Sequence, residues 1–322
     1  MMRLAFNHGS WDPTYGELVR LFRCISSTDQ ENALKFVYRR DVKSYLAARL
    51  LTIFVAKHCL GLDPVEVTVE RDPNDRPGLS NKPDFDFNLS HNGDFTVLTS
   101  CHKMRTGVDV MRVELPPASS SVNEFLHKMR SLFAPSEWYS LNNPVLGAND
   151  RMRRFYRFWC LKEAFVKNTG TGLRVNVSTV QFDLTATNPK CTHPGLVDGE
   201  WVFEEHQLPN NHVAAVSWHM PGAQEAIPAQ PGSADQSRSS LKLFGRVISL
   251  AKFVPFGHEG KSSDDTLVVE FNELSIAYEP FRELSFNQLL EDLNPWNDVS
   301  ETFWPTYCSK ELIPPSSRTQ LV

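Results

Sequence analysis

One helical stretch constrains how this chain can fold more than any other part of its sequence. Residues 150–172 read DRMRRFYRFWCLKEAFVKNTGTG, and large apolar side chains recur there every three or four positions around most of the helix circumference. Asp150 is suited to cap the start of this helix, and Gly170 is suited to end it about five turns later. A helix that is apolar on most sides must be packed on most sides, so we expect the fold to surround it.

The same stretch carries charged side chains that a buried helix holds only at a cost. Lys162, Glu163 and Lys167 lie among the apolar residues, and a buried charge is unfavourable unless it is paired or bound to a ligand. In the simplest interpretation Glu163 and Lys167 pair along the helix, for roughly 0.2–0.5 kcal/mol. In the alternative interpretation, Glu163 binds a cation and Lys167 binds an anion. Two further polar segments of the chain favour this alternative.

The first polar segment lies at the tip of a predicted β-hairpin. Apolar and polar residues alternate over 85–89, the sequence SHNGD follows at 90–94, and apolar residues then resume. This pattern predicts two strands joined by an Asn-Gly turn. Ser90 and His91 then lie near the end of a strand, where a hydroxyl and an imidazole can contact an anion. Taken alone, His91 fits a structural role better.

The second polar segment is a single carboxylate in an apolar strand. In Gly107-Val-Asp-Val-Met111 the two valines face one side of the predicted strand and Asp109 faces the other. A carboxylate in such a place requires a metal ion or a basic partner.

The rest of the chain divides at a segment of low apolar content. Residues 221–240 are rich in Pro, Gly, Ala, Gln and Ser, which predicts a flexible linker. We expect a chain that ends near residue 220 to stay folded and active, unless the aromatic end at Phe303 and Trp304 packs back on the core. Elsewhere, helices are expected at 41–61 and 125–138, a turn-rich loop at 70–79, and strands at 175–182, 201–205, 212–218 and 266–271.

Composition and charge argue against several classes of protein. The longest apolar run, residues 50–56, is far shorter than a membrane span, and the N-terminal residues lack the apolar core of a secretory signal. We therefore expect a cytosolic protein that does not bind membranes. A net charge of -5 gives no general attraction to nucleic acid. Six scattered cysteines without a C-x-x-C pair favour neither a disulfide framework nor a zinc site.

Three short blocks, taken in order, carry a resemblance to a known family. They are FNLSHNGD at 87–94, GVDV at 107–110 and WCLKEAFVK at 159–167. Together they resemble the signatures of the 4'-phosphopantetheinyl transferases of the Sfp type. The animal branch that serves aminoadipate-semialdehyde dehydrogenase is particularly similar, since residues 41–51, the Arg76-Pro77 loop and the closing Phe303-Trp304 have counterparts there. The similarity covers residues 5–220 well and the remaining chain loosely.

This resemblance implies a fold of the α/β (α+β) class with two similar halves related by a pseudo-twofold axis. Each half would be a small antiparallel sheet packed on a long helix, with coenzyme A in the cleft between them. The halves would span residues 1–105 and 106–220, the second containing the metal site. Residues 221–240 would be the linker, and residues 241–322 a partly ordered C-terminal extension.

The resemblance also implies a reaction and a set of site residues. Family members transfer the 4'-phosphopantetheine group of coenzyme A to a serine of an apo acyl or peptidyl carrier domain and release adenosine 3',5'-bisphosphate. Asp109 and Glu163 would hold Mg²⁺, which often takes one or two carboxylates plus water and phosphate oxygens. Glu163 would accept the serine proton, and Lys167 would neutralise the leaving bisphosphate. Contacts to coenzyme A would come from Arg76, Pro77, Asn88, Ser90, His91, Asp109, Glu163 and Lys167.

Two positions depart from the family pattern. Many members carry a third acid two residues after the strand aspartate, where this chain has Met111, so a further metal ligand must be water or another group. The loop before Arg76 reads Asn74-Asp75, where relatives tend to have lysine or glycine. A catalytically silent module that binds coenzyme A or a carrier protein is the alternative function, and loss of a metal carboxylate would mark it. A scaffold in which the charges merely pair along the helix is a third possibility.

Basic residues at the start of the central helix indicate a partner surface. Arg151, Arg153, Arg154 and Arg157 crowd its first turns, where cations oppose the helix dipole and have little structural advantage. Carrier domains of the fatty acid synthase and aminoadipate reductase type present acidic helices, so we expect them to dock here on a monomeric enzyme. Pairing of these arginines with acids such as Glu137 and Asp150 is the simpler alternative.

Overall fold

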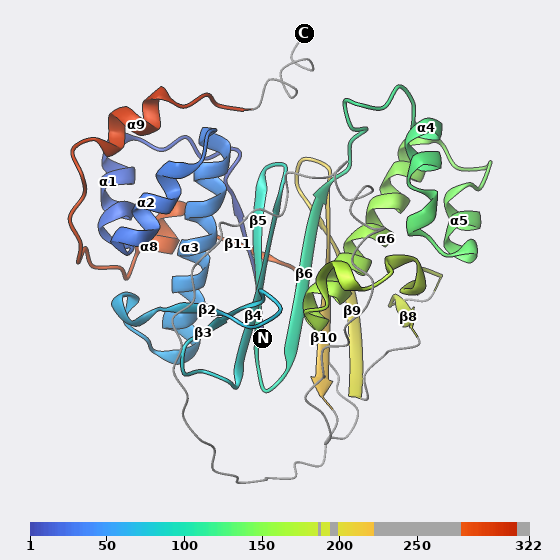
Figure 1. Cartoon of the computed structure of the whole chain (residues 1–322), viewed down its shortest axis with the longest axis horizontal. Helices are drawn as coiled ribbons and strands as arrows, with labels where there is room; N and C mark the ends of the chain where they lie inside the picture. The colour runs from blue at the N-terminus through green and yellow to red at the C-terminus, as the bar shows by residue number, and fades with distance from the viewer. Residues whose placement is uncertain (186–187, 194–198, 222–277, 314–322) are drawn as a thin grey trace.

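The fold has four layers, with two sheets in the middle and helices outside each sheet. This computed structural model describes residues 1–185, 188–193, 199–221 and 278–313. The sheets pack against each other through apolar side chains from both, and helices cover their outer faces (Figure 1). The buried residues between the sheets are Ala5, Phe95, Val97, Cys101, Val108, Val110, Ala214, Val216 and Trp218.

The N-terminal half contains a four-stranded sheet in the order β11-β1-β5-β4. Its elements up to residue 102 are β1 (Met2–Asn7), α1 (Tyr15–Arg23), α2 (Ser27–Lys35), α3 (Arg39–Leu60), a 3-10 turn (Pro64–Glu66), the small hairpin β2 (Val69–Arg71) and β3 (Pro77–Leu79), β4 (Phe85–Asn92) and β5 (Phe95–His102). The predicted hairpin with its Asn-Gly turn is therefore confirmed, and Gly93 adopts the left-handed conformation, with φ +57.

The C-terminal half contains a three-stranded antiparallel sheet in the order β6-β10-β9. Its elements are β6 (Arg105–Arg112), α4 (Val122–Lys128), α5 (Pro135–Leu141), α6 (Ala148–Thr169), β7 (Gln181–Asp183), β8 (Lys190–Thr192), β9 (Gly199–Leu208) and β10 (His212–Pro221), with 3-10 turns at Arg130–Leu132, Gly172–Arg174 and Val177–Thr179. Helix α6 lies across the outer face of β6 and β10 (Figure 1).

Helix α6 is the buried helix that the sequence predicts, but it starts three residues earlier. Gly147 caps it, and Asp150 lies in its first turn, where a carboxylate is favoured by the positive end of the helix dipole. Gly170 ends it with φ +67, as expected. Lys162 is fully buried and pairs with Glu137 at 2.9 Å, so this buried charge is compensated within the fold.

Two other predicted elements are wrong in detail. The helix expected at 125–138 is divided into α4 and α5, because Pro135 starts a new helix at its first position. The strand expected at 175–182 is instead one 3-10 turn, Val177–Thr179, followed by the short β7. The strand expected at 266–271 and the linker at 221–240 lie outside the described residues, apart from Pro221, which ends β10.

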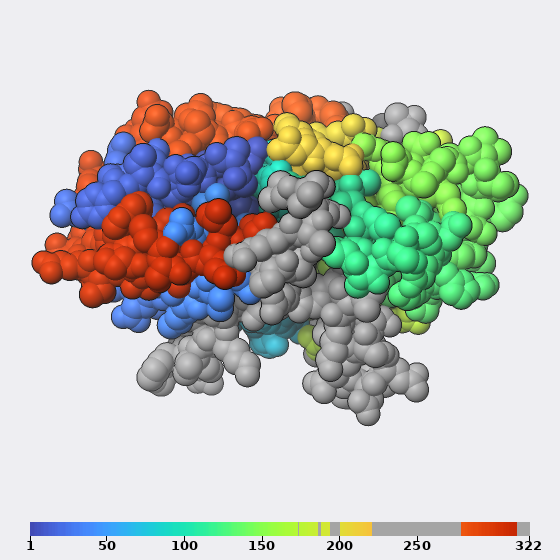
Figure 2. All heavy atoms as spheres, turned by 90° about the horizontal axis from the view of Figure 1, so that it is seen from above, coloured from blue at the N-terminus to red at the C-terminus, as the bar shows by residue number. Residues whose placement is uncertain are grey.

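Residues 278–313 return to the N-terminal half and complete its core. Strand β11 (Arg282–Glu283) pairs with β1, while α8 (Phe286–Leu290) and α9 (Phe303–Ser309) pack beside the N-terminal helices, as Figure 2 shows in orange and red beside blue. Leu284, Leu289, Leu290 and Phe303 belong to the same buried cluster as α3. Residues 1–105 alone therefore lack part of their core, and a chain that ends near residue 220 is not expected to stay intact.

None of the helices within the described residues is both long enough and apolar enough to cross a membrane.

Candidate active site

The site lies where the edge strands of the two sheets meet. Strands β4 and β6 run beside each other in the middle of Figure 1, and side chains of β4 accept hydrogen bonds from backbone N–H groups of β6. We call these three side chains the clasp: Asp86 accepts from Thr106 at 2.7 Å, Asn88 from Val108 at 3.0 Å and Asn92 from Arg112 at 2.9 Å. The clasp sets β4 of one half in register with β6 of the other.

Three predicted site residues meet in one hydrogen-bonded group between the halves. Lys167 of α6 donates to Asp109 Oδ1 at 2.8 Å, to Ser90 Oγ at 2.9 Å and to the carbonyl of Val108 at 3.0 Å. Ser90 Oγ donates to the same Asp109 oxygen at 2.8 Å. The side chains come from β4, β6 and α6, so the group exists only when both halves are docked.

Glu163 lies one turn before Lys167 but is not its partner. No hydrogen bond or ion pair to the Glu163 carboxylate occurs among the described residues, and Lys167 pairs with Asp109 instead. Burial, reinforced by the charge of Asp109 and opposed by that of Lys167, raises the pKa of Glu163 to about 7. The interpretation of Glu163 and Lys167 as a helix pair is therefore wrong.

The two carboxylates fit a divalent cation. Asp109 Oδ2 is buried and has no hydrogen-bond partner within the described chain, although buried oxygens normally have one. Glu163 is close enough for its pKa to be raised by Asp109, and a metal ion would relieve that repulsion. No cluster of three or more His, Cys, Asp or Glu side chains occurs in the described ranges, and Met111 is buried in the core of the C-terminal half. Water and substrate oxygens would supply the other ligands.

Cationic groups lie near the part of the site that contains Ser90 and His91. Burial, followed by the charges of Lys167 and Arg40, lowers the pKa of His91 to about 4. Burial, followed by His91, Lys43 and Arg40, lowers the pKa of His8 to about 3. Both imidazoles are therefore neutral at physiological pH. We call Arg40, Lys43 and Lys167 the cationic cluster.

Arg40 and Lys43 are site residues that the sequence reasoning missed. Both come from the first two turns of α3, where cations oppose the helix dipole just as those of α6 do. The segment Arg39-Arg-Asp-Val-Lys43 thus carried the same signal that pointed to the arginines of the central helix.

Arg76 and Asn88 lie close to the site but are engaged by the protein. Arg76 is 7% exposed and donates to the Thr106 carbonyl at 2.7 Å, to the Lys167 carbonyl and to Asp86. Asn88 belongs to the clasp, and Pro77 begins β3 beside Arg76. Contacts of these three residues with coenzyme A stay predictions.

The arginines at the start of α6 all have partners, but within the described ranges Arg157 alone binds a carboxylate. Arg157 binds Glu205 through two bonds of 2.7 Å. Arg151 and Arg154 donate to the carbonyls of Leu141 and Ser140 at the C-terminal end of α5, at 3.0 and 3.1 Å. Their remaining partners, and that of Arg153, are neutral groups: Asn123, Asn142, the Ser140 hydroxyl and Asn211. Glu137, one of the two acids suggested as partners, binds Lys162.

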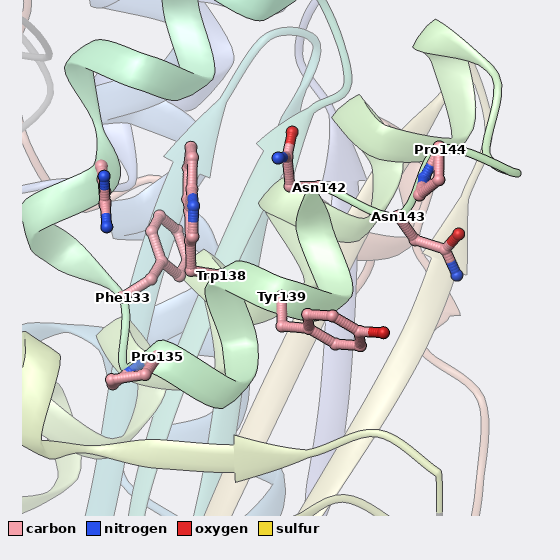
Figure 3. Close-up of a pocket in the computed structure, with 8 residues that line it drawn as sticks. Phe133, Pro135, Trp138, Tyr139, Asn142, Asn143 and Pro144 are labelled. Atoms are coloured by element: carbon pink, nitrogen blue, oxygen red, sulfur yellow. The ribbon is translucent and has the colours of Figure 1, made fainter.

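A separate pocket of about 450 Å³ lies beside α5. Figure 3 shows its lining, which is formed by Arg130, Phe133, Pro135, Trp138, Tyr139, Asn142, Asn143 and Pro144. The Arg130 guanidinium lies over the Trp138 ring, 5.6 Å from its centroid, and Tyr139 is 82% exposed. None of the residues that meet around Asp109 contributes to this pocket.

Comparison with known proteins matches two consecutive parts of the chain to the same family. Residues 9–103 match the model of a 4'-phosphopantetheinyl transferase N-terminal region, and residues 105–217 match the 4'-phosphopantetheinyl transferase superfamily. A Xenopus laevis L-aminoadipate-semialdehyde dehydrogenase-phosphopantetheinyl transferase is 35% identical over 274 residues, which cover 80% of this chain and 88% of that protein. The Mus musculus protein of the same name is 27% identical over 329 residues, covering 97% and 92% of the two chains.

Two further comparisons lie outside the animals. A Thraustochytrium phosphopantetheinyl transferase is 31% identical over 221 residues, which cover 66% of this chain and 76% of that protein. A solved Chronobacterium ammoniagenes ACPS-CoA complex is 17% identical, with a TM-score of 0.29, and covers 36% of this chain and 96% of its own; so small an overlap supports no statement about the site. The relatives are named as enzymes, and both carboxylates of the motif are present, so a silent binding module is not supported. The chain belongs to the 4'-phosphopantetheinyl transferase superfamily and is an enzyme that transfers 4'-phosphopantetheine to carrier proteins.

Proposed function

We propose that this enzyme takes the 4'-phosphopantetheine group from coenzyme A, with Mg²⁺ held between Asp109 and Glu163, and releases adenosine 3',5'-bisphosphate. One observation carries the metal assignment: the buried Oδ2 of Asp109 has no hydrogen-bond partner among the described residues and lies near a second buried carboxylate. When bound, Mg²⁺ stabilises negative charge on the pyrophosphate as it breaks.

Glu163 is the base in this proposal. The serine Oγ of the carrier forms a bond to the phosphorus next to the pantetheine arm, while the bond from that phosphorus to the bridging oxygen of the nucleotide breaks. The serine proton passes to Glu163, directly or through water, and the electron pair leaves with the bisphosphate. Glu163 suits this role because its carboxylate has no hydrogen-bond or ion-pair partner among the described residues that would have to be displaced.

The cationic cluster receives the phosphates in this proposal. Lys167 neutralises the leaving bisphosphate, and Arg40 and Lys43 add charge around the neutral His91, which supplies hydrogen bonds together with Ser90. Support comes from the mutual effects of these groups on the pKa values of His8 and His91. A group of cations gathered beside Ser90 and His91 favours an anionic ligand.

Carrier domains dock, in this proposal, beside the start of α6. Arg151, Arg153 and Arg154 have only neutral partners among the described residues, so their charge is available to an acidic partner. The curated animal relatives are named for L-aminoadipate-semialdehyde dehydrogenase, and carrier domains of the aminoadipate reductase and fatty acid synthase type are the substrates we propose for a monomeric, cytosolic enzyme.

The direct test combines the full chain, isotopically labelled coenzyme A and an apo carrier domain, with intact-mass measurement of the carrier. We expect the mass of one phosphopantetheine to be added in Mg²⁺ and not in excess chelator. Transfer that persists at full rate in chelator would refute the metal site. Transfer that never occurs, while a family enzyme modifies the same carrier in parallel, would refute the proposed substrates.

A further inference from the structure

Each hydrogen bond of the clasp forms one rung between β4 and β6. The first rung, at Asp86, differs from the others because Asp86 also forms an ion pair. Asp86 accepts the Thr106 N–H at 2.7 Å and also binds the guanidinium of Arg76, which donates to the Thr106 carbonyl at 2.7 Å. Both outward backbone groups of Thr106 are thereby held by one charged pair. The rung at Asn92 has only a neutral amide.

The same guanidinium also holds the end of α6. Arg76 donates to the carbonyl of Lys167, which is among the last four carbonyls of the helix and so has no partner inside it. A cation at this end is favoured by the helix dipole. The space beside Gly170, which ends the helix, is also bounded by Arg76: a side-chain carbon there would lie 3.8 Å from Arg76 Cδ. Arg76 therefore joins the β2–β3 hairpin of the N-terminal half to the helix of the C-terminal half.

Two site residues project from the backbones that this pair fixes. Lys167 has its carbonyl on Arg76 and its ammonium on Asp109 Oδ1. Asp109 is three residues after Thr106 on β6, an extended strand in which displacement at one residue is passed to the next. A shift of either backbone would change the contact between Lys167 and Asp109.

We propose that Arg76 and Asp86 are positioning residues for the transfer reaction, acting through Lys167 and Asp109 and not by contact with coenzyme A. This inference rests on the proposed roles of Lys167 and Asp109. The guanidinium is buried and already has three protein acceptors, one of them a carboxylate, whereas a phosphate ligand would have to displace Asp86.

Two single variants separate positioning from phosphate binding. Arg76→Lys keeps the positive charge but loses the planar fork that reaches three acceptors. Asp86→Asn keeps an acceptor for Thr106 but loses the charge that pairs with Arg76. We expect kcat to fall roughly 10–100-fold in each, with an unchanged KM for coenzyme A, as is typical when a supporting partner of a site residue is lost. If Arg76 instead binds phosphate, Arg76→Lys would raise KM, and Asp86→Asn would lower it by freeing Arg76.

Asn92→Ala is the matched control, because it removes an equivalent rung at the far end of the clasp, next to Arg112. We expect it to lower the melting temperature while kcat stays near that of the wild type. The double variant Arg76→Met with Asp86→Leu removes both buried charges together, which guards against loss of folding from an unpaired charge; its kcat is expected to stay low.

Wild-type kcat in the folded double variant, or an equal loss of kcat in Asn92→Ala, would overturn the inference. A wild-type enzyme that transfers no phosphopantetheine would instead refute the proposed function on which it rests. Because the wild type is measured in the same assay, the two failures are distinguishable.

Discussion

Lys167 of α6 pairs with Asp109 of β6 at 2.8 Å and not with Glu163 of its own helix, which has no ion-pair partner among the described residues. The lysine thus occupies one oxygen of the strand carboxylate, whereas the other oxygen has no hydrogen-bond partner within the described chain. In the proposed mechanism, that oxygen and Glu163 would hold the metal ion.

Removal of either carboxylate charge is expected to abolish transfer. Asp109→Asn and Glu163→Gln keep the side-chain shape but lose metal affinity, so the rate should fall by more than the roughly 10–100-fold typical of residues that only support a ligand. Mass gain on the carrier in Mg²⁺ measures the effect. Asp183→Asn, a carboxylate of the exposed end of β7, is the matched control and should keep full activity. Near-normal turnover in either site variant would contradict the metal assignment.

Glu163→Gln should stabilise the metal-free enzyme in a pH-dependent manner. The pKa of Glu163 is raised from 4.5 to about 7 in the folded protein, so the folded state binds this proton more tightly than the unfolded state. The ionised carboxylate therefore costs stability progressively as the pH rises from about 4.5 to 7. We expect the melting temperature of the variant to exceed that of the wild type at pH 8, by on the order of 5 °C, and to match it near pH 4.5. An equal difference at both pH values would argue against a raised pKa.

The C-terminal segment should be needed for stability. Leu290 is fully buried in the core of the N-terminal half, so Leu290→Ala is expected to cost about 2–5 kcal/mol, measured by chemical denaturation. Leu312→Ala is the control, because that side chain is 60% exposed. Deletion of the residues after 277 should be more severe than either change, and a truncated protein with an unaltered melting temperature would contradict the fold described here.

The arginines of α6 should affect the carrier and not coenzyme A. Arg153→Glu reverses a charge whose one hydrogen-bond partner among the described residues is the amide of Asn211, so it tests docking with little effect on α5. We expect a raised KM for the carrier domain, weaker dependence on salt, and an unchanged KM for coenzyme A. Arg23→Glu, the same reversal at the end of α1 in the N-terminal half, should have no such effect. A defect confined to coenzyme A would place Arg153 at the nucleotide instead.

The site residues that the sequence identified are polar or charged side chains in segments that are predicted to be buried. Ser90 at a hairpin tip, Asp109 in an apolar strand, and Glu163 and Lys167 in a buried helix each carry a charge or hydroxyl where the local pattern predicts burial. The local pattern placed them on the right elements, whereas their assignment to one site came from the resemblance of the three sequence blocks to a known family.

What the sequence could not supply is the way distant segments meet. The spacing of Glu163 and Lys167 suggested an ion pair along the helix. Because β6 lies beside α6, Lys167 pairs with Asp109 instead. The role of Asp86 depends on two sheet edges lying side by side, and neither edge is marked by composition. The return of residues 278–313 to β1 likewise depends on tertiary contacts formed far along the chain.

The pairing of β1 with β11 has a consequence for biosynthesis. The C-terminal half is continuous from β6 to β10, so it can fold as soon as it leaves the ribosome. The N-terminal half is synthesised before the C-terminal half, but its core also needs β11, α8 and α9, which are translated after β10. The half that is translated earlier is thus completed later, and a nascent chain stalled before residue 278 would hold the acids of the site without the completed N-terminal half against which they must dock.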